Sequence, residues 1–111
     1  MRRLLILTLI TMSLWTSILI LPANAVDTTN GAEIFSVHCA GCHINGGNII
    51  RRGKNLKKNA LKKYSMDSLE AITNIVTNGK NNMSAYQDRL TTEEIQNVAT
   101  YVLEQAEKDW R

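Results

Sequence analysis

The sequence predicts an all-α domain built from four or so helices. Apolar residues recur at spacings of three and four in the second half of the chain, and no useful length of sequence alternates apolar with polar residues. With 111 residues and a formal charge of +3, the chain is long enough for one small domain at most. A sheet-containing fold is therefore not expected.

The first 25 residues have the features of a secretory signal. Arg2 and Arg3 precede an apolar run over residues 4–21, and the Ala-Asn-Ala sequence at 23–25 provides a cleavage site. An uncleaved membrane anchor is the alternative, because the run is long for a signal. Its threonines and serines dilute it, however, whereas spanning usually takes ~20 strongly apolar residues. We predict cleavage after residue 25, which leaves a domain of residues 26–111.

The first predicted helix of this domain runs from Thr28 to His38. Asn30 and Glu33 are spaced as a capping box at its start. Its apolar side is expected to contain Ile34 and Phe35, with Val37 and His38 as further candidates.

A second helix is predicted from Ser68 to about Thr77. Asp67 and Glu70 have capping-box spacing, and the Asn-Gly pair at 78–79 ends the helix. Its buried stripe is expected to be Leu69, Ile72, Ile75 and Val76.

The last helix is predicted to begin after Thr91, which forms a capping box with Glu94, and to end near Glu107. Its apolar positions follow the three-four spacing of one buried face. They are Ile95, Val98, Ala99, Val102, Leu103 and Ala106.

The functional prediction depends on the motif Cys39-Ala40-Gly41-Cys42-His43. Two thiols three positions apart on a helical turn can each form a thioether to one vinyl group of a haem, and the adjacent imidazole can ligate the iron. Cys-x-x-Cys-His is accordingly typical of c-type haem attachment. We expect one haem c per chain, held covalently by Cys39 and Cys42, with His43 as an axial ligand.

Three other uses of the motif are weaker. A thiol redox motif follows a strand in a βαβ unit, and no strand is predicted here. A structural zinc site needs four Cys or His ligands, and outside the motif only His38 is present. A simple disulfide would need no histidine.

The second axial position of the iron has three candidates: His38, Met66 and Met83. His38 directly precedes the motif on the proximal side and cannot reach around the ring. Met66 lies at a helix start, where a methionine is more often a packing residue. Met83 lies in a loop between two helices that can cover the distal face, so we favour it. A His/Met pair raises the reduction potential and suits outer-sphere electron transfer.

Basic residues are concentrated between residues 49 and 63. Seven of the eleven basic residues after the signal lie in this stretch, and no acidic residue interrupts them. A solvated loop with a short helix accounts for part of this pattern, but such a cluster also creates a positive field that can steer an acidic partner. Nucleic acid is a poor candidate partner for an exported haem protein. The cluster comprises Arg51, Arg52, Lys54, Lys57, Lys58, Lys62 and Lys63.

Several residues around the haem motif form a recognisable pattern: Gly31 and Phe35 before it, Val98 and Tyr101 late in the chain, and most specifically the Asn-Gly-Lys-x-x-Met sequence that ends at Met83. By these residues, the chain over 26–111 resembles the cytochrome c6 family, within the class I cytochromes c. Further matching stretches are residues 30–35, 56–58, 69–72, 78–83 and 101–103, with Trp110 near the end. The resemblance implies a class I cytochrome c fold wrapped around one covalently bound haem.

The resemblance also implies a function. Cytochromes c6 carry single electrons in the thylakoid lumen, or the periplasm, from the cytochrome b6f complex to photosystem I. Transient docking is then expected at Arg51, Arg52, Lys62 and Lys63, and at Arg89, which matches a basic family position near the haem edge. One departure is Ser84, which stands where the family usually has proline after the ligand methionine. We expect a monomer without stable membrane insertion after cleavage.

Two alternative functions follow from the same residues. A carrier that reduces a respiratory terminal oxidase would need the same haem and a similar charged surface. A haem sensor or peroxidase would need an open distal site, and a Met83 ligand disfavours it. The sequence contains no constellation of a catalytic base and a nucleophile, so we do not predict an enzyme.

Overall fold

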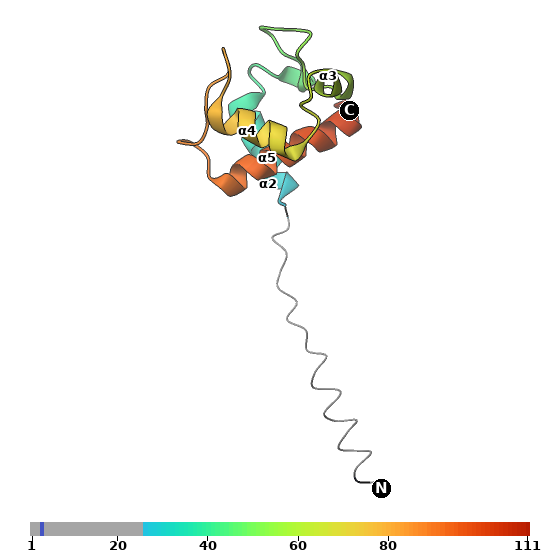
Figure 1. Cartoon of the computed structure of the whole chain (residues 1–111), viewed down its shortest axis with the longest axis vertical. Coiled ribbons are helices and arrows are strands. Elements are labelled where there is room, and N and C mark those ends of the chain that lie inside the picture. The colour runs from blue at the N-terminus through green and yellow to red at the C-terminus, as the bar shows by residue number, and fades with distance from the viewer. Residues whose placement is uncertain (1–2, 4–25) are drawn as a thin grey trace.

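The computed structural model describes Arg3 and residues 26–111, so nearly all of the predicted signal lies outside the described residues. Its helices are α2 (Thr28–Ile34), α3 (Lys58–Lys63), α4 (Leu69–Asn78) and α5 (Thr92–Glu107). A π-helical turn η1 (Phe35–Cys39) follows α2 directly, and a 3-10 turn η2 (Ile44–Gly46) comes next. Residues 26–111 contain no strand, only an isolated bridge between Lys80 and Met83. The all-α prediction is confirmed (Figure 1).

Helix α5 organises the packing of the other helices. It contacts α2 most extensively, then α4, and also α3 and η2. Figure 1 shows α2 and α4 beside α5, with α3 close to the C-terminus. The central core joins α2, η1, α4 and α5 through Ile34, Phe35, Ile72, Val76, Leu90, Ile95, Val98, Ala99 and Val102.

Helices α2 and α5 approach closely at Gly31. A Cβ added there would collide with the backbone carbonyl of Asn97 and lie 3.0 Å from the Cβ of Tyr101. Asn97 is buried, and its amide is satisfied because Nδ2 donates to Asn30 Oδ1 at 3.0 Å and Oδ1 accepts from the Asp27 N–H at 3.2 Å. This crossing therefore needs both a glycine and a buried asparagine.

The predicted cap of the first helix was wrong. The N-cap is Asp27, whose carboxylate accepts from the Asn30 N–H at 3.0 Å, while the Asn30 side chain bonds to Asn97 across the helix crossing. Val37 and His38 are also exposed rather than apolar-side residues. The reason is that the backbone widens to a π-helical turn after Ile34, which removes the 3.6-residue periodicity on which that expectation depended.

Of the two N-caps predicted for the later helices, the one for α4 is wrong and the one for α5 is confirmed. In α4 the N-cap is Ser68, whose hydroxyl accepts from the Ala71 N–H at 3.1 Å, so the Asp67 capping box is wrong by one residue. In α5 the predicted box is present: Thr91 Oγ1 accepts from the Glu94 N–H at 3.1 Å, and Glu94 Oε2 accepts from the Thr91 N–H at 2.7 Å. This reciprocal pair fixes where α5 begins.

The predicted buried stripes are largely confirmed. Within α4, Ile72 and Val76 are buried and Ile75 is half-buried, but Leu69 in the first turn is 40% exposed. Within α5, Leu103 is half-buried and the other five predicted positions are buried. Among the described residues, no helix is both long and apolar enough to cross a bilayer.

Candidate haem site

The two cysteines and His43 lie where helical structure ends after α2. Cys39 closes the π-helical turn, and its carbonyl accepts from the N–H groups of Cys42 at 3.2 Å and His43 at 2.9 Å. Both thiols are free; Cys39 is half-buried and Cys42 is exposed. Burial, with a smaller effect from neighbouring Cys42, raises the pKa of the Cys39 thiol to about 11. The two sulfurs and the imidazole thus come from one tight turn.

The imidazole of His43 is oriented by a backbone carbonyl. Its Nδ1 lies 2.8 Å from the carbonyl oxygen of Gly47. A carbonyl can only accept, so Nδ1 donates in this hydrogen bond, and in the neutral imidazole the lone pair is then on Nε2. This arrangement is typical of metal-binding histidines, whose second nitrogen donates to an acceptor outside the metal site.

The loop that supplies this carbonyl is held by Trp110. Gly46 has φ +75°, and a Cβ added to it would meet the indole ring. Trp110 Nε1 donates to the Leu56 carbonyl at 3.0 Å, and the Leu56 N–H donates to the Gly46 carbonyl at 2.7 Å. Phe35 packs on the same indole with ring centroids 5.0 Å apart. The chain end therefore fixes the turn that orients His43.

Met83 lies in a short loop directly after α4. The loop begins at Gly79, with φ +69°, and is closed by a reciprocal pair of 3.0 Å hydrogen bonds between the backbones of Lys80 and Met83. Met83 is half-buried and packs against the central core, whereas Met66 is half-buried but is not part of that packing. His38 is exposed. The packing favours Met83 over the other two candidates.

The basic residues predicted to dock a partner lie on the exposed surface. Arg51, Arg52, Lys62 and Lys63 are all exposed. Lys58 pairs with Glu107 at 2.7 Å, and the ammonium groups of Lys54 and Lys63 lie 5.1 and 5.4 Å from the ring centroid of Tyr64. Arg89 lies elsewhere, with its guanidinium 4.2 Å from the ring centroid of Tyr86.

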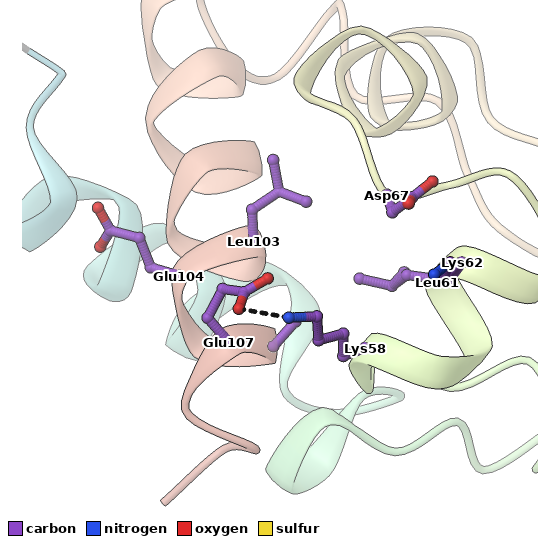
Figure 2. A pocket seen from close by; sticks show the side chains of 8 residues that line it. Lys58, Leu61, Lys62, Asp67, Leu103, Glu104 and Glu107 are labelled. Carbon is purple, nitrogen blue, oxygen red and sulfur yellow. Dashed lines mark hydrogen bonds and ion pairs between the residues drawn. The ribbon is translucent and has the colours of Figure 1, made fainter.

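Two hollows lie along α3 and α5, with volumes of about 320 and 580 Å³. Figure 2 shows the smaller one, where the Lys58–Glu107 pair links the two helices beside Leu61 and Leu103. Neither hollow is lined by Cys39, Cys42, His43 or Met83. Their linings combine lysines with acidic residues on the open surface, so we assign the chemistry to the cysteine turn instead.

Comparison with known proteins identifies the family. A protein described as "Cytochrome c6-like" from Nostoc sp. strain PCC 7120 is 70% identical over 111 residues, which is the full length of both chains. The chain belongs to the cytochrome c6 family. A cytochrome c6 from the same Nostoc strain is 48% identical, again over the full length of both.

Solved structures of cytochromes c6 have the same fold. Cytochrome c6C from Synechococcus sp. PCC 7002 matches with a TM-score of 0.71 and 64% identity, over 73% of this chain and 99% of that one. Cytochrome c6 from the diatom Phaeodactylum tricornutum matches with a TM-score of 0.74 and 45% identity, over 76% and 99% of the two chains. The class I cytochrome c fold is thereby confirmed.

Residues 26–102 also match the family model described as "Cytochrome C oxidase, cbb3-type, subunit III". As a cytochrome c6 family member, the chain is an electron carrier of the cytochrome c type, and its cofactor is a c-type haem.

The residues present fit that cofactor. The turn offers two free thiols and an imidazole whose Nδ1 is bonded to the Gly47 carbonyl, so that its other nitrogen, Nε2, can face a metal; these are the groups that haem attachment requires. Within residues 26–111, no group of three or more His, Cys, Asp and Glu side chains gathers as a metal site. The donor set therefore favours haem over a structural zinc ion, which would need four such ligands.

Sequence reasoning missed the residues that support the site. Gly47 acts through its carbonyl, and the only available signal was the glycine pair that follows the motif. Trp110 was noted as a family match without a role. The Tyr86 hydroxyl, which donates to the His38 carbonyl at 3.1 Å, joins two segments far apart in the sequence, and no local pattern could have revealed that contact.

Proposed function

We propose that this cytochrome carries single electrons from the cytochrome b6f complex to photosystem I, in the thylakoid lumen or the periplasm. In this proposal residues 1–25 are removed on export, and one haem is attached covalently to Cys39 and Cys42. His43 and Met83 are its axial ligands, and the protein acts as a monomer without catalytic activity. Two observations support this proposal: the chain belongs to the cytochrome c6 family, and its cysteine turn is suited to haem attachment.

The observation that carries the haem-binding part of the proposal, on which electron transfer depends, is the His43–Gly47 hydrogen bond at 2.8 Å. It keeps Nε2 free as a ligand, beside two thiols placed on the same turn. When bound, the haem iron supplies the one-electron redox couple. The protein's own part is to hold the imidazole in one orientation and to keep the Met83 loop packed against the core. Both oxidation states then have the same ligands, which keeps reorganisation small.

Exposed apolar side chains on both sides of the cysteine turn support a role in transient docking. Val37 is 77% exposed, Ile44 61%, Ile49 58% and Ile50 54%. Apolar surface next to the attachment site allows a partner to approach without the cost of desolvating charge. Brief redox encounters use small interfaces of this kind.

The exposed basic residues support electrostatic steering towards an acidic partner. Arg51 and Arg52 follow the apolar pair Ile49–Ile50 directly, and Lys62 and Lys63 lie at the end of α3. Arg89 is a further exposed cation, held against the ring of Tyr86. Such a field raises the rate of encounter and is screened by salt.

Delivery of electrons to a respiratory terminal oxidase is the second candidate. The chain is 70% identical to the cytochrome c6-like protein of Nostoc but 48% identical to the cytochrome c6 of the same strain, and both alignments cover both chains completely. This difference supports an acceptor other than that of cytochrome c6 itself. The match to a family described as an oxidase subunit favours the same candidate.

Flash kinetics separate the two acceptors. The reduced holoprotein is mixed with photosystem I, or with a terminal oxidase, at equal ionic strength, and its oxidation is followed through the haem absorption band. The photosynthetic proposal predicts oxidation by photosystem I that saturates with carrier concentration and slows with salt. Turnover with the oxidase alone would move the assignment to the second candidate.

The intact mass of the native protein tests export, because a retained Met1 would contradict cleavage of the signal.

A further inference from the structure

The side chain of Tyr86 links the methionine loop, residues 79–90, to the segment that precedes the haem-attachment turn. Its hydroxyl donates to the carbonyl oxygen of His38 at 3.1 Å, across 48 positions of sequence. Cys39 directly follows His38, and Met83 lies three residues before Tyr86. The hydrogen bond therefore joins the chain segments that carry two of the four proposed haem-holding residues.

The other hydrogen bonds of residues 79–90 are local. They close the Lys80–Met83 pair, attach the Tyr86 N–H to the Val76 carbonyl at 2.9 Å, and connect the Tyr86 carbonyl to the N–H groups of Arg89 and Leu90 at 2.9 Å each. These bonds tie the loop to α4 and to itself. Among the described residues, the Tyr86 hydroxyl makes the hydrogen bond that reaches from this loop to η1.

The His38 carbonyl is available for this contact because it lies at the end of η1. Carbonyls in the last turn of a helix lack intrahelical donors. The N–H groups of Cys42 and His43, four and five positions later, both bond to Cys39 instead. The Tyr86 hydroxyl thus supplies a donor that the backbone does not.

The ring of Tyr86 is held so that its hydroxyl points to this carbonyl. The Arg89 guanidinium lies 4.2 Å from the ring centroid, which is favourable for a cation–π contact. The His38 ring meets Tyr86 nearly edge-on, with centroids 6.0 Å apart and planes at 76°. Tyr86 is half-buried and packs against the core. Few rotamers remain to such a ring, so little entropy is lost in forming the bond.

We propose that Tyr86 is a positioning residue for Met83, and that its hydroxyl bond to the His38 carbonyl keeps the methionine loop closed over the iron. The proposal rests on the assignment of Met83 as the second axial ligand. Residue 84 is a serine, which leaves the backbone after Met83 freer than a proline would. The hydrogen bond from Tyr86 to the His38 carbonyl, which lies outside the loop, can restrain the loop backbone where the serine does not.

The test is the rate at which imidazole displaces the methionine ligand from the oxidised holoprotein. Tyr86→Phe keeps the ring and both stacking contacts and removes the hydroxyl alone. Because the variant loses one net hydrogen bond between the loop and η1, opening and imidazole binding are expected to become about fivefold faster. The far-red iron–sulfur absorption band persists before imidazole is added. The reduction potential falls, since a thioether favours Fe(II) and a looser ligand loses part of that preference.

Tyr64→Phe is the matched control. It deletes the same atom from an exposed tyrosine whose ring lies near the ammonium groups of Lys54 and Lys63, in a chain segment outside the loop. Its imidazole rate and potential are expected to equal those of the parent protein. Loop opening and global unfolding both break the Tyr86 hydrogen bond, so Tyr86→Phe is also expected to lower the thermal unfolding midpoint modestly. The imidazole rate is the measurement that separates the two roles. A purely structural role would move the midpoint and leave the rate unchanged.

Rescue provides the second test. Ser84→Pro in the Tyr86→Phe background is expected to return the rate towards that of the parent, because proline restricts the open loop. The Ser84 N–H makes no backbone hydrogen bond in the described structure, so proline removes none.

Equal imidazole rates for Tyr86→Phe and Tyr64→Phe would overturn the proposal. Retention of the iron–sulfur band in Met83→Ala would instead refute the ligand assignment, and the two failures are thus distinguishable.

Discussion

Replacing Gly31 by alanine tests the closest contact between α2 and α5. The new Cβ would collide with the Asn97 carbonyl and lie 3.0 Å from the Tyr101 Cβ. The obstacles are the carbonyl carbon and oxygen of Asn97, which are backbone atoms, and the Cβ of Tyr101, which is attached directly to the backbone, so rotamer changes cannot relieve the overlap. The two helices must separate instead. Separation also strains the Asn97 hydrogen bonds to Asn30 and Asp27.

The expected cost follows from these contacts. Overpacking a tight site costs about 1–3 kcal/mol, and a rigid backbone obstacle places this site near the upper end. Weakening two buried hydrogen bonds adds up to about 1 kcal/mol each. Alanine returns about 1 kcal/mol through its better helix propensity. The net loss is about 2–4 kcal/mol, a large share of a stability that is typically about 5–15 kcal/mol.

Urea unfolding of the oxidised holoprotein measures this loss. With a slope of about 1 kcal/mol/M for a small domain, the midpoint should fall by about 2–4 M. Gly53→Ala is the control, because nothing lies within 4 Å of its added Cβ and its φ is not in the left-handed region. Its midpoint should not move. An unchanged or raised midpoint for Gly31→Ala would refute the close crossing.

Three further perturbations test the support of the haem turn and the surface charges. Trp110→Phe removes the indole donor to the Leu56 carbonyl, so the unfolding free energy should fall by about 1 kcal/mol; no change in the urea midpoint would show that this bond is dispensable. Lys58→Ala breaks a pair with Glu107 whose side chains are 61% and 65% exposed, so thermal unfolding should register less than about 0.5 kcal/mol, and a larger loss would mean that the pair is not screened by solvent. Lys62→Glu should slow reduction of the acceptor most at low ionic strength; rates with the same ratio to the parent at every salt concentration would remove the steering argument.

Local patterns predicted most of the fold. The capping box at Thr91 and Glu94 and the apolar spacing of α5 are local in sequence, and both are present in the structure. The prediction of the α4 cap failed because two neighbouring residues could each serve as the N-cap. Asp67 and Ser68 are both good caps, and only the path of the chain selects Ser68.

The site was predicted less completely, for a physical reason. Cys39, Cys42 and His43 are contiguous and their spacing alone indicates haem chemistry. The contacts that orient them join positions separated by tens of residues, as between Trp110 and Leu56. The π-helical turn before Cys39 also changes which side chains face the core, and it has no signature in the composition of that segment.

The central claim is that haem is bound covalently at the Cys39–His43 turn and that Met83 completes its ligation. Absorption spectra of the oxidised and reduced protein, followed by acid-acetone extraction, test it most directly. We predict that the haem stays with the protein and that the parent shows narrow low-spin bands together with a weak far-red iron–sulfur band. The iron–sulfur band is expected to be lost in Met83→Ala. Haem that extracts freely from protein matured in a haem-attaching host, or an iron–sulfur band that survives in Met83→Ala, would contradict the account.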